Sequence, residues 1–543
     1  MRPDSDETKF RRGASSMVSA VFISRILGIA LIVPMQNLIG NYALGLYQLV
    51  YPLYTVMITL STAGFPLALS KSISDFVAQG KLREASHMFS IVGRFLMLLG
   101  IPAFLIMWFA GPYLVGLSVP GDAMRIAAIP AIRALAPALL LLPLMSAQRG
   151  YLQGNFRLKQ SGASQVVEQI TRVVVVLLAL IIAVKMGAGP TVTAAIATFG
   201  ATAGAITAYM LLLQSVKKMR RETLRRLPHL KKSALRARPI LRNLFAMSLP
   251  ITLGTLVLPI SQTIDGWTVP RVLVTSGATL VSAFSQYGVY SGEALRLIQL
   301  PLSFATAIGT SALPAISESV TLRNPALTRT RLHQALHMST LIALPAFAVL
   351  FTMARPIDIA LFRGTDGVTL MKATSIIVVL SGLELVSTYI LQGYNAFYRP
   401  VVHMAAGAVL KLALNLTLIP IYGIAGAAYA SIAEYALSSW LNMALIRRIS
   451  GLRISYVKLS VRPFLATLVF GAWLYGIERV GQSVAHALTL DHSRLLALAI
   501  LLLGLALGIP IYLLSAFFFK ASTLDELVHL PLVGRLISRF LRA

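Results

Sequence analysis

Apolar runs of about 20 residues, each bounded by charged residues or by Gly and Pro, follow one another along almost the whole chain. A hydrocarbon core about 30 Å thick needs roughly 20 apolar residues per helix, so each run predicts one membrane-spanning helix. We expect fourteen spans, at residues 15–39, 46–70, 89–111, 127–148, 164–184, 190–214, 243–264, 294–317, 334–353, 370–394, 400–421, 424–446, 461–480 and 495–519. The first run is too long and too interrupted by polar residues for a cleavable signal, so it predicts a retained helix.

The composition agrees with an integral membrane protein. Of 543 residues, 57% are hydrophobic and 12% are charged, and the mean hydropathy is +0.76. A net charge of +29 would suggest nucleic acid as the partner of a soluble protein, but that interpretation needs a basic face in water. The chain has no cysteine, which excludes disulfides, thiolate nucleophiles and cysteine-ligated metals.

The basic residues give the orientation, because cytoplasmic loops are enriched in Lys and Arg. Most of the 48 basic residues fall in the even-numbered loops and the two tails, and few fall in the odd-numbered loops. We therefore expect a plasma membrane protein with both termini in the cytoplasm. Residues 215–242 are strongly basic, with Glu222 as their acid. They favour a topology anchor beside anionic headgroups over a nucleic-acid or regulatory site.

Two short patterns recur about half a chain apart. Leu152-Gln153-Gly154 returns as Leu391-Gln392-Gly393, and Pro66 with Ser70 returns as Pro314 with Ser317. The alternative is that such motifs recur through packing needs alone. An all-α fold of two six-helix bundles in parallel orientation, followed by an extra helix pair, is the favoured interpretation, with a substrate cavity between the bundles. The expected parts are residues 1–214 (first bundle), 215–242 (basic linker), 243–446 (second bundle), 447–519 (extra helices) and 520–543 (an amphipathic cytoplasmic tail).

Ionisable side chains at membrane depth are costly and normally face a cavity, a partner or a pathway. The basic ones are Arg25, Arg94, Arg133, Arg172, Arg296 and Lys411, and the acidic ones are Glu168, Asp265, Glu293, Glu384 and Glu434. Arg25 is deep in the first span with no acid within a helical turn, so we expect it to face a cavity. The pairs Glu168 with Arg172 and Glu293 with Arg296 have helical spacing and could either neutralise themselves or serve function.

Lys411 is the counterpart of Arg172 in the second half, so both halves offer a cation. Guanidinium and ammonium groups in a low-dielectric cavity suit phosphate or pyrophosphate, which predicts an anionic substrate head group. Asp265 follows hydroxyl and amide side chains and is a candidate for coupling to a proton or small cation. The alternative is an N-cap or interfacial residue beside Gly266.

Motifs for catalysis are weak or missing. Gly80-Lys81 lacks the preceding glycine of a P-loop, so we expect no ATP hydrolysis. His333 and His337 are interpreted as surface histidines. Asp358 and Asp366 are interpreted as solvated loop residues rather than a glycosyl-transfer pair. We expect no enzyme activity.

Several segments together resemble the MurJ, YtgP and SpoVB group of the multidrug/oligosaccharidyl-lipid/polysaccharide (MOP) exporter superfamily. They are Ile23-Ser24-Arg25-Ile26-Leu27-Gly28, residues 162–169, Thr263-Ile264-Asp265, and residues 296–319 from Arg296 through Pro301 and Gly309 to Pro314. The resemblance implies a fourteen-helix, MATE-like flippase that moves the lipid-linked peptidoglycan precursor lipid II from the inner to the outer leaflet. It also implies a cationic cavity for the pyrophosphate head group, a groove formed by the last two helices for the polyprenyl tail, and coupling to Na⁺ or membrane potential.

The resemblance implies that Arg25 and Arg296 are cavity arginines. Glu168, Arg172 and Lys411 are further substrate-binding candidates because of their charge at membrane depth. Asp265 and Asn415 are ion-coupling candidates. Two basic positions of some relatives correspond here to Leu31 and the uncharged stretch 47–59, so the full arginine cluster is not carried over. The expected partners are an undecaprenyl-pyrophosphate-linked substrate, membrane lipids and cell-wall synthesis proteins, without a cofactor, metal or nucleic acid, and the expected state is a monomer. The alternatives are a flippase for another undecaprenyl-linked oligosaccharide, as in sporulation, a cation or drug antiporter, and a membrane glycosyltransferase.

Overall fold

The structure of the protein is a computed structural model. It describes residues 17, 19–20, 23–24, 26–28, 30–62, 64–118, 122–226, 237–451 and 457–522. All regular secondary structure in these residues is helical, which confirms the all-α prediction. Arg25 and the predicted tail helix beyond residue 522 lie outside the described residues.

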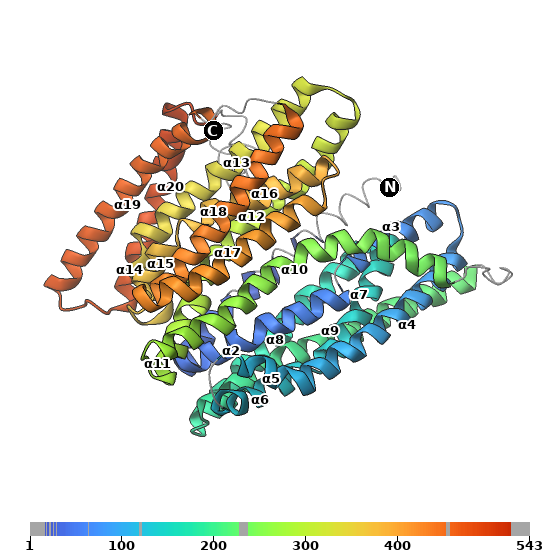
Figure 1. The fold of residues 1–543 in the computed structure, drawn as a ribbon, viewed down its shortest axis with the longest axis horizontal. Helices are drawn as coiled ribbons and strands as arrows, with labels where there is room; N and C mark the ends of the chain where they lie inside the picture. The colour runs from blue at the N-terminus through green and yellow to red at the C-terminus, as the bar shows by residue number, and fades with distance from the viewer. Residues whose placement is uncertain are drawn as a thin grey trace, which may run out of the picture. The chain divides into compact units, whose positions relative to one another are not determined.

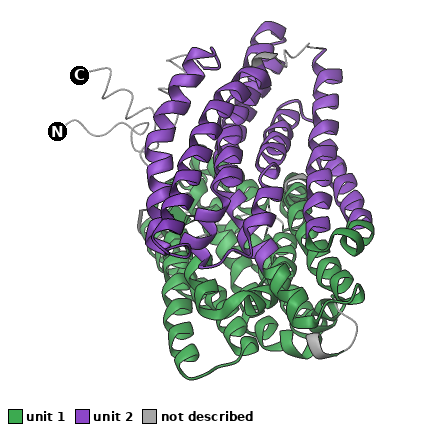
Figure 2. Cartoon of the chain, turned by 90° about the vertical axis from the view of Figure 1, so that its left-hand side faces the viewer, with its two compact units in different colours: residues 1–288, 415–424 green, residues 289–414, 425–543 purple. Residues whose placement is uncertain are grey.

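The chain separates into two compact units, which are coloured in Figure 2: Met1–Gly288 with Asn415–Ile424, and Val289–Leu414 with Ala425–Ala543. The first unit contains α2 (Ile32–Thr62), α3 (Phe65–Ala78), α4 (Leu82–Leu105), the π-helix η1 (Ile106–Ala110), α5 (Gly111–Gly116), α6 (Ala123–Leu135), α7 (Ala138–Gly154), α8 (Leu158–Lys185), α9 (Pro190–Arg226), α10 (Ala237–Thr275) and α11 (Leu280–Gly288). Within this unit α8 and α9 lie side by side (Figure 1).

The second unit contains η2 (Val289–Ala294), α12 (Leu295–Thr321), α13 (Pro325–Thr352), α14 (Ala354–Phe362), α15 (Val368–Thr374), α16 (Ile377–Gly393), α17 (Tyr398–Tyr422), α18 (Ile424–Ser450), η3 (Val457–Val461), α19 (Arg462–Ala487) and α20 (Arg494–Phe518). The last turns of α17, from Asn415 on, belong to the first unit. Local sequence explains the start of α13: Asn324 caps this helix by accepting a hydrogen bond from the Leu327 N–H at 3.0 Å, and Pro325 occupies the first turn.

Eleven helices within the described residues are long and apolar enough to cross a membrane, or twelve if the bent pair Ala237–Leu249 and Thr252–Thr275 counts as one span. The chain is therefore a multi-pass membrane protein, and the count of fourteen stays a prediction. One cause of the difference is that a single apolar segment, Ile26–Ala78, contains the end of the first predicted span and all of the second. That segment contains a break at Gly40, whose φ of 75° lies in the left-handed region, one residue after the predicted end of the first span.

The repeated patterns of the sequence pack against each other inside each unit. A Cβ on Gly154, the last residue of Leu152-Gln153-Gly154, would lie 2.7 Å from the carbonyl oxygen of Ser70 in α3. A Cβ on the matching Gly393 would lie 3.2 Å from the carbonyl oxygen of Leu313 in α12, beside Pro314. Each glycine lets two helices approach closely. Both motifs therefore serve helix packing, as the duplication and the alternative of recurrence through packing needs both predict, and the duplication stays a prediction.

The expected bundle and linker boundaries stay predictions. α9 extends the sixth predicted span as far as Arg226, so the first part of the basic segment 215–242 continues a helix. α10 starts at Ala237, inside the same basic segment.

Candidate functional site

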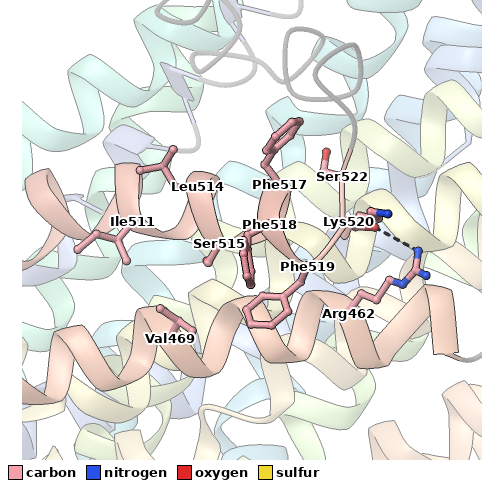
Figure 3. A pocket seen from close by; sticks show the side chains of 10 residues that line it. All are labelled: Arg462, Val469, Ile511, Leu514, Ser515, Phe517, Phe518, Phe519, Lys520 and Ser522. Atoms are coloured by element: carbon pink, nitrogen blue, oxygen red, sulfur yellow. Dashed lines mark hydrogen bonds between the residues drawn. The ribbon is translucent and has the colours of Figure 1, made fainter.

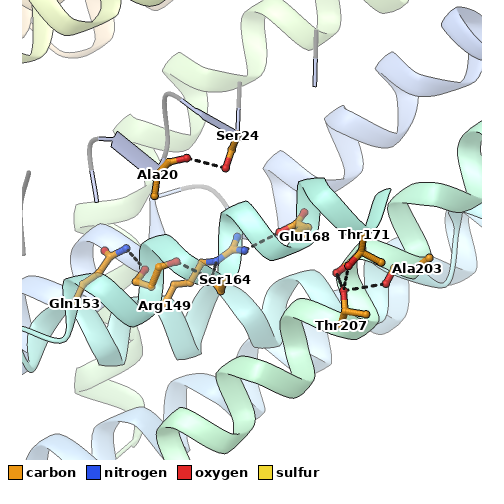
Figure 4. Close-up of polar contacts among 11 residues, drawn as sticks. Ala20, Ser24, Arg149, Gln153, Ser164, Glu168, Thr171, Ala203 and Thr207 are labelled. Atoms are coloured by element: carbon orange, nitrogen blue, oxygen red, sulfur yellow. Dashed lines mark hydrogen bonds and ion pairs between the residues drawn. The ribbon is translucent and has the colours of Figure 1, made fainter. Parts of the chain in front are cut away.

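In the first unit, a guanidinium from α7 reaches two polar residues of α8 (Figure 4). Arg149 donates from Nη2 to Oε2 of Glu168 at 2.7 Å and from Nε to Oγ of Ser164 at 3.0 Å. Both charged side chains are mostly buried, with 17% and 21% of their surface exposed. Because burial strengthens a charge-assisted hydrogen bond, this pair links α7 to α8. Glu168 is therefore neutralised by Arg149, which the sequence analysis did not select.

Arg172, one turn after Glu168 on α8, pairs with tyrosines and not with Glu168. Its Nη2 donates to Tyr47 Oη at 2.8 Å and its Nη1 donates to Tyr51 Oη at 3.1 Å. The guanidinium carbon also lies 5.1 Å from the centroid of the Tyr51 ring, a cation–π contact. The spacing of Glu168 and Arg172 thus does not produce the self-neutralising pair that the sequence allowed. Tyrosine hydroxyls leave the positive charge of Arg172 uncompensated, and its Nε is buried without a hydrogen bond.

Arg296, in the first turn of α12, is half-buried. Within the described residues it forms no hydrogen bond and no ion pair, and its Nε is buried. The alternative in which Glu293 and Arg296 neutralise each other is therefore wrong for this structure. A cation on an apolar helix without a carboxylate partner is costly unless it meets an anion or water.

Lys411 of α17, in contrast, is fully engaged. Its Nζ lies 3.1 Å from Oε2 of Glu434 in α18, and the two side chains are only 3% and 6% exposed. Glu384 of α16 is also buried, and it accepts a hydrogen bond from Thr388 Oγ1 at 2.9 Å. The Lys411–Glu434 ion pair is neutral, so Lys411 could bind an anion only after this pair opens.

The two ion-coupling candidates meet in the first unit. Asn415 donates from Nδ2 to Oδ1 of Asp265 at 3.1 Å and to Oγ1 of Thr268 at 2.8 Å. All three are buried, at 0%, 2% and 8% exposure. Asp265 lies in the interior of α10, so the N-cap alternative is wrong. The amide oxygen of Asn415 is buried and accepts no hydrogen bond, which leaves an oxygen that could bind a hard cation beside a carboxylate and a hydroxyl.

An apolar groove of about 1120 Å³ lies along α19 and α20 in the second unit (Figure 3). Its walls include Leu514, Phe517 and Phe518, which are 70%, 55% and 78% exposed. Two cations, Arg462 and Lys520, stand at one end, and Arg462 donates to the Lys520 carbonyl oxygen at 3.4 Å. The groove is suited to an acyl or prenyl chain that carries an anionic group.

Two interpretations of polar side chains are wrong. His337 is not a surface histidine: it is 6% exposed, and its Nε2 lies 2.6 Å from the carbonyl oxygen of Ala521. Asp358 is not a solvated loop residue: it lies in α14 and is 1% exposed. Both errors arise because sequence spacing does not show which helix packs over a given face.

The structure brings Asp265 and Asn415 together and separates Arg172 from Glu168. It describes no atom of Arg25. Besides Arg149, three residues that contact the candidates were not predicted from the sequence: Thr268, Tyr47 and Tyr51. One signal was present: Arg149 lies one helical turn before Gln153 of the repeat, which also contacts α8, by donating to Ser161 Oγ at 2.9 Å.

Two curated proteins are similar to this chain over almost its whole length. The lipid II flippase MurJ of Bacillus subtilis (strain 168) is 27% identical over 518 residues, which cover 93% of this chain and 94% of that protein. Stage V sporulation protein B of the same organism is 24% identical over 535 residues, covering 98% and 99%.

Solved structures show the fold. The inward closed conformation of a lipid II flippase MurJ superposes with a TM-score of 0.66 at 16% identity, over 93% of this chain and 98% of that one. An inward-facing multidrug resistance MATE family transporter of the MOP superfamily gives 0.64 at 16% identity, over 79% and 94%. This confirms the MATE-like architecture. The family model for polysaccharide biosynthesis proteins matches residues 10–320, more than half of the chain. The chain therefore belongs to the polysaccharide biosynthesis protein family and has the fold of MOP superfamily transporters.

Proposed function

We propose that this protein is a flippase that moves a lipid-linked peptidoglycan precursor, lipid II, from the inner to the outer leaflet of a bacterial plasma membrane. The observation that carries this proposal is Arg296, a cation in a membrane helix without a carboxylate partner among the described residues. A pyrophosphate would provide the missing anion, because guanidinium groups bind phosphate oxygens through two parallel hydrogen bonds. The near full-length similarity to a lipid II flippase supports the same substrate class.

The other cations would contribute unequally. Arg172 is half-buried, and its positive charge is not neutralised by a carboxylate, because its two hydrogen-bond partners are tyrosine hydroxyls. Arg25 is the further cation of the head-group site in this proposal. Lys411 and Glu168 are each held in an ion pair, so they would bind substrate only in a state in which these pairs exchange partners.

The groove along α19 and α20 would hold the prenyl tail. Its exposed aromatic and aliphatic walls suit a long hydrocarbon chain, and Arg462 and Lys520 would meet negative charge at its end. Burial of each CH₂ group contributes about 0.8 kcal/mol, so a long chain would bind without specific polar contacts.

A small cation would couple to transport at Asp265 and Asn415. The residues present fit such an ion: one carboxylate, one hydroxyl and one buried amide oxygen that accepts no hydrogen bond. Na⁺ bound there would neutralise the buried carboxylate; membrane potential is the alternative source of drive.

Both termini lie in the cytoplasm in this proposal, and the protein acts as a monomer without catalysing a covalent reaction. A flippase for another undecaprenyl-linked oligosaccharide is the second candidate. It is favoured by the 24% identity to stage V sporulation protein B over almost the whole chain. A drug antiporter fits less well, because a cationic drug would be repelled by an unpaired Arg296.

The test uses bacterial cells whose own lipid II flippases can be shut off and replaced by this protein. We expect lipid II to stay accessible in the outer leaflet with the wild-type chain and to accumulate in the inner leaflet with Arg296→Ala. Arg399→Ala is the matched control, because Arg399 is an exposed arginine at the start of α17. If the wild-type chain reaches the membrane and lipid II still accumulates inside, lipid II is not the substrate and the oligosaccharide candidate takes its place.

A further inference from the structure

A carboxyl group that the proposed transport function does not use is buried in the second unit, in the middle of α16. Glu384 is 4% exposed. Its Oε1 accepts a hydrogen bond from Thr388 Oγ1 at 2.9 Å, one turn further along the same helix. Within the described part of the chain, this neutral hydroxyl is the one donor to the carboxyl group. An ionised carboxylate in a membrane helix is costly unless a cation or several donors compensate it.

No cation balances Glu384 among the residues that the structure describes. α16 packs against α12 and α13, and hydrogen bonds connect it to α18 and α17. Glu434 of α18 is the charged residue that interacts electrostatically with Glu384, and Lys411 of α17 already pairs with Glu434 at 3.1 Å. None of the cations on these four helices forms an ion pair with Glu384. The charged and histidine side chains on these helices, together with the neighbouring tyrosine, are Arg296, Glu318, Arg329, Arg331, His333, His337, Arg399, His403, Lys411, Glu434, Tyr435, Arg447 and Arg448.

A chain of hydrogen bonds leads from Glu384 to the start of α17. Asn442 of α18 is fully buried, and its Nδ2 donates to Thr388 Oγ1 and to Ser387 Oγ, each at 3.1 Å. The Oδ1 of Asn442 lies 2.7 Å from Nδ1 of His403, in the second turn of α17. Because an amide oxygen only accepts, the hydrogen lies on His403 Nδ1. All donors along this chain therefore point from His403 toward the carboxyl group.

We propose that Glu384 is a proton-binding site, connected to the start of α17 by the hydrogen-bond chain that ends at His403. With a proton, Glu384 and the Lys411–Glu434 pair together carry no net charge; without it, they carry one uncompensated negative charge. Loss of the proton turns the bond from the hydroxyl into a charge-assisted one and polarises the chain behind it. The site thereby links binding of a proton to the contacts among α16, α17 and α18.

The proposal goes beyond the proposed function and does not depend on the substrate that the protein moves. It concerns a different position from the oxygens of Asp265 and Asn415, which lie in the first unit, whereas every residue of this chain lies in the second. His403 is half-buried, so the outer end of the chain is within reach of solvent or lipid head groups. The second unit would therefore respond to pH separately from any response of the first unit to Na⁺.

The test is infrared difference spectroscopy of the purified full-length protein in lipid nanodiscs, following the C=O stretch of protonated carboxyl groups. At pH 6.5 less than about 1% of an exposed glutamate is protonated. We expect a protonated-carboxyl band at this pH in the wild type that is missing in Glu384→Gln. Glu318→Gln is the matched control, because Glu318 of α12 has 61% of its side chain exposed, and it should leave the band unchanged.

Two further variants test the chain. Thr388→Val removes the donor to the carboxyl group, so it should shift the band to higher wavenumber without removing it, which also assigns the band if Glu384→Gln does not fold. Thr388→Val and His403→Phe should each let the band persist to higher pH, because each removes a donor that stabilises the ionised form. A band that stays the same in both variants overturns the connection to α17.

Two results overturn the proton site itself. One is a difference spectrum between the wild type and Glu384→Gln without a protonated-carboxyl band at pH 6.5. The other is a band that disappears when choline chloride is replaced by an equal concentration of NaCl, because the carboxyl group would then bind Na⁺ in place of the proton.

Discussion

Asn415 donates a hydrogen bond to Asp265 over 3.1 Å, although 150 positions separate the two residues in the sequence. The amide uses both of its N–H groups on the Asp265 and Thr268 side chains, so its oxygen is oriented away from them and is left without a donor. The carboxylate of Asp265, the hydroxyl of Thr268 and the amide oxygen of Asn415 thus form a set of oxygens that suits a small cation.

Substitution of Asp265 tests whether this set of oxygens binds Na⁺. Asp265→Asn should abolish the stabilisation of the protein by Na⁺, because it removes the only formal negative charge of the three residues. We expect the melting temperature of the wild type to rise with NaCl relative to equal concentrations of choline chloride, and the variant to show no difference. Asp75→Asn is the control for loss of one carboxylate. A sodium effect that persists in Asp265→Asn would assign the ion to another place.

Substitutions of Arg296 distinguish the role of its positive charge from the role of its hydrogen-bond geometry. Arg296→Lys keeps the positive charge but loses the planar guanidinium, so it should retain partial flippase activity, whereas Arg296→Ala should lose at least tenfold. The measurement is the rate of lipid II exposure in the depleted cells described above, at equal membrane abundance. Wild-type rates in Arg296→Ala would exclude an anion-binding role for this residue.

Lys411 and Glu434 test whether a buried pair serves structure or transport. Removing one partner, as in Lys411→Met, should cost about 3 to 5 kcal/mol because it leaves an uncompensated buried charge. The double variant Lys411→Met with Glu434→Gln should recover most of this stability. If the pair is structural, activity returns with stability; a stable but inactive double variant would show that Lys411 binds substrate.

Helix packing in the second unit gives a prediction about Gly309. A Cβ at this position would lie 2.1 Å from Cδ2 of the Tyr389 ring, so Gly309→Ala forces α12 and α16 apart or displaces the ring. We expect a loss of about 1 to 3 kcal/mol in thermal or denaturant unfolding. Gly476→Ala is the matched control, because nothing lies within 4 Å of its Cβ position. Equal stabilities of the two variants would contradict the close approach.

The pH dependence of stability follows from Asp358. Its pKa is about 6 in the folded protein and close to 3.8 when exposed, so the folded state binds the proton more tightly. The free energy of unfolding should therefore fall as pH rises from about 4 through 6, by up to about 3 kcal/mol, and level off above that. Asp358→Asn should flatten this part of the profile. A variant with the same slope as the wild type would remove Asp358 as its source.

The sequence alone determined the class of the fold and the positions of most helices, because a lipid interior accepts only long apolar segments whose backbone bonds are satisfied within a helix. It also contained the repeated motifs at Gly154 and Gly393, since close helix contacts demand small residues at fixed places.

Tertiary structure decided which charges meet. Helical spacing allowed Glu168 to pair with Arg172. In the structure, Glu168 instead forms an ion pair with Arg149, and Arg172 donates hydrogen bonds to two tyrosine hydroxyls. The sequence predicts Asp358 as a solvated loop residue. In the structure it lies in α14 and is buried, because neighbouring helices pack against α14. A side chain's partner depends on how helices far apart in the chain are turned toward each other, and no local pattern contains that information.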